Sequence, residues 1–162
     1  MRRALFLDRD GVINVEKGHY VYRVEDFDFV PGIMEVIKRV KEAGVQVFIV
    51  TNQGGIAKGL YDHSNVKNVH DLLKETCKSN GFGIDAIYYC PHHSDIASCL
   101  CRKPGSLLFE KIIAKFDIDA GHSLMIGDRQ RDVEAANNAG IPGIQIESNQ
   151  RIDDIVENWL NG

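Results

Sequence analysis

The chain has 162 residues, of which 44% are hydrophobic and 26% charged, and its formal net charge is −4. This length suits one domain with its own core. The acidic balance argues against nucleic acid or anionic membranes as partners. No apolar run is long enough to span a membrane, and Asp8 interrupts the N-terminal stretch too early for a signal-peptide core. We therefore expect a cytoplasmic protein in which residues 1–162 form a single domain.

Strand-like and helix-like segments alternate along the chain. Apolar runs typical of buried strands occupy residues 4–7, 45–50, 84–89, 122–126 and 143–146. Helical spacing of apolar residues occurs at 32–43, after a predicted cap at Ser64, and at 105–116, 129–139 and 151–160. This alternation predicts an α/β fold in three layers, a parallel sheet with helices on both faces.

Two connecting loops are long for such a fold, at residues 14–31 and 90–104. Long loops in compact domains usually serve function. Neither is long enough to form a separate cap domain, so we expect an open site whose walls are these two loops.

Polar residues follow four of the predicted strands. Asp8 and Asp10 follow the first strand, Thr51 closes the second, Lys103 follows the third and Asp128 follows the fourth. Ligands of open parallel sheets bind beyond the carboxyl ends of the strands, so these side chains should converge. A carboxylate can approach a phosphate only when a cation offsets its charge, and Mg²⁺ with oxygen ligands is the usual choice.

The segments Asp8-Arg-Asp-Gly, Thr51-Asn, Arg102-Lys-Pro and Gly127-Asp resemble the four motifs of the haloacid dehalogenase-like (HAD) phosphatases. They occur in the family's order and cover essentially the whole chain. The resemblance implies a Rossmann-like HAD fold.

The same resemblance implies a role for each motif residue. Asp8 would attack phosphorus and form an aspartyl-phosphate. Asp10 would act as general acid and base, and Thr51 and Lys103 would bind the phosphoryl oxygens. Mg²⁺ would be held by Asp8, the main-chain carbonyl of Asp10 and Asp128. Since Asp10 must start protonated, we expect acidic neighbours to raise its pKa.

A second cluster lies in a predicted zinc-binding loop at residues 90–101. Cys90, His92, Cys99 and Cys101 offer three thiolates and an imidazole, which suits a closed tetrahedral Zn²⁺ site of structural type. His93 is a competing ligand that spacing alone does not exclude. The loop runs directly into Arg102-Lys103, so zinc would order the segment that carries the phosphate-binding lysine.

Within the superfamily, the zinc loop and Thr51-Asn-Gln resemble two groups, the D-glycero-D-manno-heptose 1,7-bisphosphate phosphatases and the histidinol-phosphate phosphatases. The segments Gly54–Gly59 and Gly18–Val21 favour the heptose group. The short His92-to-Cys99 spacing and Gly127-Asp-Arg are also seen among the histidinol phosphatases. The favoured interpretation implies removal of the 7-phosphate in the synthesis of nucleotide-activated heptose for lipopolysaccharide or surface polysaccharide. The alternative is a histidinol-phosphate phosphatase of histidine biosynthesis.

A bisphosphate must also be held at its far phosphate, and the guanidinium groups of Arg102 and Arg129 are the best candidates. The resemblance implies a substrate site lined by Glu16, Lys17, Gly18, His19, Thr51, Asn52, Gln53, Gly54, Arg102, Lys103 and Arg129.

Two other functions use similar residues. A polynucleotide phosphatase is disfavoured by the acidic charge and by the lack of a basic or aromatic strand-binding track. A non-catalytic phospho-receiver module is disfavoured by Asp10, which is placed to hydrolyse an aspartyl-phosphate. We expect a monomer that acts on a small phosphorylated sugar, without nucleic-acid or membrane partners.

Overall fold

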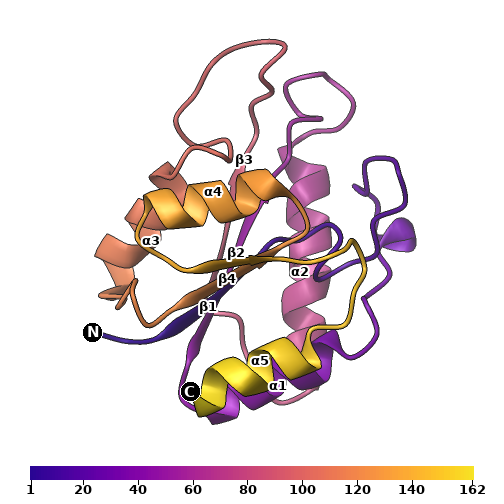
Figure 1. Ribbon diagram of the computed structural model, residues 1–162. Coiled ribbons are helices and arrows are strands. Elements are labelled where there is room, and N and C mark those ends of the chain that lie inside the picture. The colour runs from indigo at the N-terminus through magenta and orange to yellow at the C-terminus, as the bar shows by residue number, and fades with distance from the viewer.

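A five-stranded parallel sheet forms the centre of the protein, described over residues 1–162 by a computed structural model (Figure 1). The strand order is β3-β2-β1-β4-β5, and every neighbouring pair is parallel. The strands are β1 (Ala4–Leu7), β2 (Gln46–Asn52), β3 (Ala86–Cys90), β4 (Leu124–Gly127) and β5 (Gly143–Gln145). The predicted fold class is confirmed.

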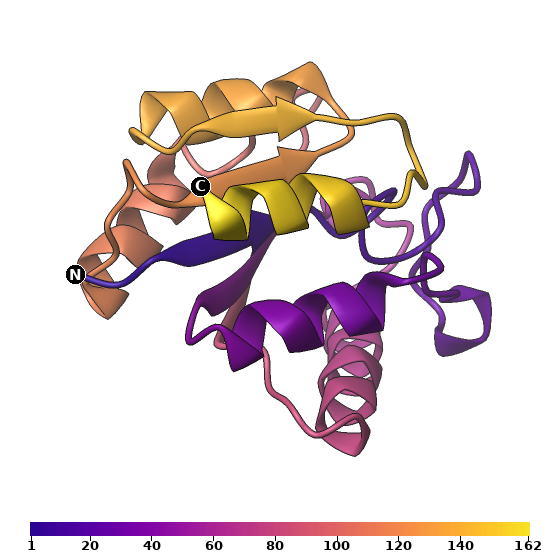
Figure 2. The same cartoon turned by 60° about the horizontal axis from the view of Figure 1, so that its bottom comes forward.

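Helices cover both faces of this sheet. They are α1 (Ile33–Glu42), α2 (His63–Ser79), α3 (Leu107–Phe116), α4 (Gln130–Asn138) and α5 (Asp153–Asn161), with a short 3-10 helix at Val24–Asp26. Figures 1 and 2 show α1 and α5 together on one face and α3 and α4 on the other. None of the helices combines the length and the apolar character that crossing a membrane requires.

The alternation of side chains along β1 divides the core into two parts. Leu5 and Leu7 pack with α1, α2 and α5, whereas Ala4 and Phe6 pack with α3 and α4. Because both faces are buried, the strand is apolar throughout, and its first polar side chain, Asp8, comes directly after its last residue. The end of β1 therefore positions this carboxylate at the edge of the sheet.

The predicted cap of α2 was wrong. Asp62 caps this helix, since its carboxylate accepts a hydrogen bond from the Asn65 amide at 3.0 Å and the Asn65 side chain accepts one from the Asp62 amide. Ser64 lies inside the first turn and donates to Asp62. A capping box needs an acceptor three residues before its partner, a spacing that Asp62 and Asn65 satisfy.

Candidate active site

Asp8, Lys103 and Asp132 form a buried row of charges at the carboxyl edge of the sheet. The Lys103 ammonium lies 2.9 Å from Oδ1 of Asp8 and 2.6 Å from Oδ1 of Asp132. It also donates to the main-chain oxygen of Val50 at 2.7 Å. No role was predicted for Asp132, yet this residue pairs with the same ammonium as Asp8.

Three carboxylates at this edge of the sheet lie near a single ammonium group, that of Lys103. Ligand oxygens of Asp8, Asp128 and Asp132 lie within 4.8 Å of one another, against the single ammonium of Lys103. Burial and the Asp132 carboxylate raise the pKa of Asp8 to about 8, although Lys103 acts in the opposite direction. A divalent cation would relieve this repulsion, so the donor set fits Mg²⁺.

The main chain of Asp10 contributes to the same fit. Its carbonyl oxygen accepts no hydrogen bond from the protein, although the neighbouring Arg9 carbonyl accepts three backbone amides. A carbonyl left free beside a carboxylate cluster is a suitable third ligand for a hard cation. The residues expected at the Mg²⁺ site are therefore compatible with it.

The expected raised pKa of Asp10 is wrong for the substrate-free protein. Burial does raise this pKa, but the Arg9 guanidinium and hydrogen bonds from Arg9, Asn14 and Gln53 outweigh burial and hold it below the usual value. Arg9 is almost fully buried and donates to Oδ1 of Asp10 at 3.0 Å and to the Val21 carbonyl at 2.7 Å. The prediction considered only acidic neighbours and overlooked this cation.

Gln53 is hydrogen-bonded to two predicted catalytic residues, Asp10 and Thr51. Its side-chain nitrogen donates to Oδ2 of Asp10 at 3.1 Å and to the Thr51 hydroxyl at 2.9 Å. Its oxygen accepts a hydrogen bond of 2.7 Å from Tyr61, whose ring stacks on Tyr22. Gln53 was predicted to bind substrate, and its buried side-chain amide also positions Asp10 and Thr51 through these hydrogen bonds.

Asn52 holds the segment that carries the lysine. Its side-chain oxygen accepts from the Lys103 amide at 3.0 Å and its nitrogen donates to the Lys103 carbonyl at 3.2 Å. The zinc loop supports the same segment, because the Arg102 amide donates to Sγ of Cys99 at 3.3 Å. Lys103 is thus fixed through its main chain as well as its ammonium.

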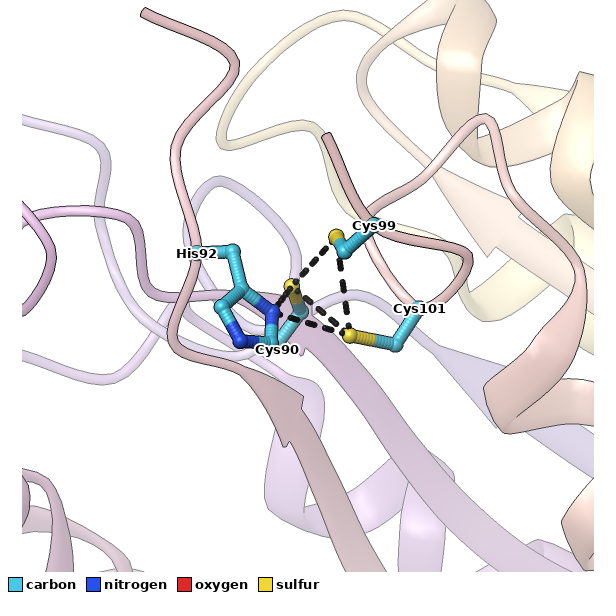
Figure 3. A group of neighbouring side chains, drawn as sticks. All are labelled: Cys90, His92, Cys99 and Cys101. Atoms are coloured by element: carbon cyan, nitrogen blue, oxygen red, sulfur yellow. Dashed lines mark hydrogen bonds between the residues drawn. The ribbon is translucent and has the colours of Figure 1, made fainter. Parts of the chain in front are cut away.

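The cysteine and histidine cluster has the shape of a zinc site (Figure 3). The side chains of Cys90, His92, Cys99 and Cys101 point toward one another. The distances between their ligand atoms run from 3.2 Å between His92 Nδ1 and Cys101 Sγ to 3.7 Å between the sulfurs of Cys90 and Cys99. A tetrahedron with metal–sulfur bonds of about 2.3 Å has edges of about 3.8 Å, so the four donors fit Zn²⁺.

His93, the competing zinc ligand, lies outside this cluster. Its Nδ1 accepts a hydrogen bond from the Asp95 amide at 3.1 Å, and its ring lies over Gly54. A Cβ atom at Gly54 would come within 2.8 Å of the His93 ring and 2.9 Å of the Arg102 guanidinium. Gly54 therefore makes room for these side chains and does not itself line a cavity.

Three adjoining cavities open at this edge of the sheet. The first, of about 340 Å³, is lined by Asp10, Glu16, Gly18, His19, Tyr20, Val21, Asn52, Gln53, Arg129 and Arg131. A small polar cavity holds Asp8, Thr51, Lys103 and Asp128, and a third borders the zinc loop at Arg102. Most of the predicted substrate residues thus meet here. Arg131, which the sequence analysis missed, is the one residue that lines all three.

Lys17 is a predicted substrate residue that the structure directs elsewhere. Its ammonium pairs with the Asp28 carboxylate at 2.7 Å and donates to the Asp26 carbonyl. The side chain therefore stabilises the first loop, residues 14–31, and does not line any of the three cavities.

Comparison with known proteins places this site in a family. The HAD-hydrolase-like family model matches residues 100–158, which contain Lys103 and Asp128. A crystal structure of a D,D-heptose 1,7-bisphosphate phosphatase from B. bronchiseptica, complexed with magnesium and phosphate, superposes with a TM-score of 0.91 at 28% identity and covers 98% of each chain. The fold and the aspartate–lysine site define a HAD-like hydrolase.

Two curated relatives narrow the class. The chain is 45% identical to the D-glycero-alpha-D-manno-heptose-1,7-bisphosphate 7-phosphatase of Campylobacter jejuni, over 86% of this chain and 78% of the relative. It is 39% identical to the corresponding beta-anomer enzyme of Rhodopseudomonas palustris, over 98% and 91%. The chain belongs to the family of D-glycero-D-manno-heptose-1,7-bisphosphate 7-phosphatases.

Proposed function

We propose that the protein removes the 7-phosphate of D-glycero-D-manno-heptose 1,7-bisphosphate through an aspartyl-phosphate on Asp8. The observation that carries the proposal is the buried Asp8–Lys103 pair beside Asp128, at the floor of cavities with arginines on their rim. The proposal treats residues 1–162 as one catalytic domain. The close, unbridged thiols of the zinc loop favour a reducing compartment, the cytoplasm.

The first step is displacement at phosphorus. A carboxylate oxygen of Asp8 attacks, the bond between phosphorus and the sugar oxygen breaks, and Asp10 gives its proton to that leaving oxygen. Lys103 and Thr51 stabilise the charge that spreads over the phosphoryl oxygens. When bound at Asp8, Asp128 and the Asp10 carbonyl, Mg²⁺ supplies the positive charge that lets an anionic nucleophile meet a phosphate.

The second step hydrolyses the aspartyl-phosphate and regenerates Asp8. Asp10 takes a proton from water, the water oxygen bonds to phosphorus, and the bond to Asp8 breaks, giving phosphate and a free carboxylate. The low pKa of Asp10 in the free protein suits this role as base. For the first step Asp10 must hold a proton, and a bound phosphate dianion favours this because like charge raises the pKa of a carboxyl group.

The far phosphate would be held by arginines. Arg102 and Arg129 were expected in this role, and we add Arg131 because it lines all three cavities. Three guanidinium groups favour a substrate with an anionic far end. Histidinol phosphate carries an ammonium group instead, so the charge of the rim favours the heptose bisphosphate.

The product, a heptose 1-phosphate, would serve the synthesis of nucleotide-activated heptose for lipopolysaccharide or another surface polysaccharide. The deciding experiment compares kcat/KM on heptose 1,7-bisphosphate and histidinol phosphate with Mg²⁺, using Asp8→Asn as the inactive control. We expect a preference of at least about a hundredfold for the bisphosphate, equal to roughly 2.8 kcal/mol. A preference for histidinol phosphate would overturn the assignment.

A further inference from the structure

Ser148 and Asn149, which follow β5, both contact residues of the site. Neither was predicted to do so. The Ser148 hydroxyl donates a hydrogen bond of 2.6 Å to Oδ2 of Asp128. The Asn149 side chain binds both main-chain groups of Glu16, accepting from its amide at 2.6 Å and donating to its carbonyl at 3.2 Å. Figure 2 shows the segment from β5 to α5 running toward the first loop, residues 14–31.

The backbone of Asn149 indicates that its side chain is needed. Its φ is +69°, a left-handed conformation that glycine adopts at less cost than other residues. Its amide donates to the Gly11 carbonyl at 2.8 Å, which ties it to the Asp8–Gly11 turn. The two hydrogen bonds that the side-chain amide makes to Glu16 explain why an asparagine occupies a position better suited to glycine.

The same turn explains why Ser148 reaches the aspartate. A Cβ atom at Gly11 would lie 2.2 Å from Oδ2 of Asp128, so the carboxylate packs directly on the turn. Ser148 binds Oδ2 of Asp128, while no hydrogen bond from the protein reaches Oδ1, which is free to bind a cation. The hydroxyl thus selects one orientation of this carboxylate.

We propose that Ser148 and Asn149 are positioning residues with separate tasks: Ser148 orients Asp128 for the divalent cation, and Asn149 holds Glu16 at the wall of the substrate cavity. The proposal rests on the function proposed above for the cavity, but its Ser148 half concerns the metal alone. Glu16 lines both the main cavity and the small polar cavity, so its displacement would alter the fit of the substrate.

The Ser148 half is tested by Mg²⁺ binding to the substrate-free protein, measured by titration calorimetry. Ser148→Ala removes the hydrogen bond to Asp128, and loss of such an outer partner typically weakens metal binding by 10- to 100-fold, so we expect roughly tenfold. Ser148→Thr keeps the hydroxyl and should bind Mg²⁺ like the unaltered protein. Equal Mg²⁺ affinity of the alanine variant and the unaltered protein would overturn this half, whatever the substrate.

The Asn149 half is tested with Asn149→Gly, which accommodates the positive φ and removes only the side-chain amide. We expect KM for heptose bisphosphate to rise several-fold, with kcat and Mg²⁺ affinity unchanged. Faster hydrogen exchange at the Glu16 amide should accompany this. Exchange and KM equal to those of the unaltered protein would refute the role of Asn149. If instead the unaltered protein fails to hydrolyse heptose bisphosphate, the proposed substrate fails, while the exchange measurement still decides the role of Asn149.

Discussion

The ammonium of Lys103 donates a hydrogen bond of 2.9 Å to Oδ1 of Asp8, and both side chains are buried. The pair joins the end of β1 to the segment that follows the zinc loop, 95 residues later in the chain. The proposed nucleophile is therefore held by the same cation that would bind the oxygens of the transferred phosphoryl group.

Replacing Lys103 with methionine should damage both activity and stability. The change leaves Asp8 and Asp132 buried without their cation, and breaking a buried ion pair typically costs about 3–5 kcal/mol of unfolding free energy. We expect kcat to fall at least about a hundredfold, as for removal of a transition-state donor. Denaturant unfolding and steady-state kinetics measure the two effects. Adding Asp132→Asn should restore part of the stability but no activity, and recovered activity would contradict the role of Lys103.

The raised pKa of Asp8 predicts that Mg²⁺ binding depends on pH. With a pKa of about 8 in the metal-free fold, Asp8 holds a proton at neutral pH that Mg²⁺ must displace. We expect the Kd of Mg²⁺ to weaken by about tenfold for each pH unit below about 8. Calorimetry across pH 6 to 9 in buffers of different ionisation enthalpy would reveal the released proton. A Kd independent of pH would contradict this prediction.

The same pKa predicts how the stability of the metal-free protein varies with pH. Between the usual value of 3.8 and about 8, the folded protein binds one more proton at Asp8 than the unfolded chain. Asp8 therefore lowers the free energy of unfolding progressively as pH rises through this range. Asp8→Asn should remove this contribution and stabilise the metal-stripped protein at pH 8 but not at pH 4. Chemical denaturation at both pH values measures the difference, and equal effects would show that folding does not raise the pKa of Asp8.

Removing zinc should disturb phosphate binding at a distance. The Arg102 amide donates to Sγ of Cys99, so loss of the metal loosens the segment that carries Lys103. We expect Cys99→Ser to lose zinc and kcat together, with no recovery when Mg²⁺ is added. Metal analysis and kinetics test this. Cys77→Ala, a change in the apolar core on the buried face of α2, is the matched control and should keep the full zinc content.

Arg131 should matter for the far phosphate alone. Arg131→Ala removes the one guanidinium that lines all three cavities, so we expect KM for the bisphosphate to rise about tenfold, or about 1.4 kcal/mol. KM for heptose 7-phosphate, which lacks the far phosphate, should not change. Arg39→Ala, in α1 where the guanidinium pairs with Glu157 of α5, controls for loss of a positive charge away from the site. A parallel rise in both KM values would show that Arg131 acts on the reacting phosphate instead.

The sequence predicted the residues whose position a strand determines. Asp8, Thr51 and Asp128 lie at strand ends, and the alternation of buried strands and helices is enough to bring such residues to one edge. It could not predict the direction of side chains in irregular segments. Lys17 was assigned to substrate, but an ion pair and a hydrogen bond within its own loop turn its ammonium toward Asp28 and Asp26.

The sequence also could not predict properties that depend on contacts between residues distant in the chain. The pKa of Asp10 is set by the orientation of Arg9 and by Gln53 and Asn14, and no periodic pattern encodes these contacts. Ser148 meets Asp128 only because β5 pairs with β4, which brings the two segments together. Such residues are found by their contacts and not by a motif.

Asn52 and Asn149 perform the same structural task for two different residues of the site. Each pairs its amide with both main-chain groups of one residue on another loop, Lys103 in one case and Glu16 in the other. The loop around Lys103 and the loop around Glu16 are therefore anchored independently of each other. Substitutions in the first loop can accordingly change which sugar is accepted while the phosphate-transferring residues stay in place, so a single catalytic edge can serve several substrates over evolutionary time.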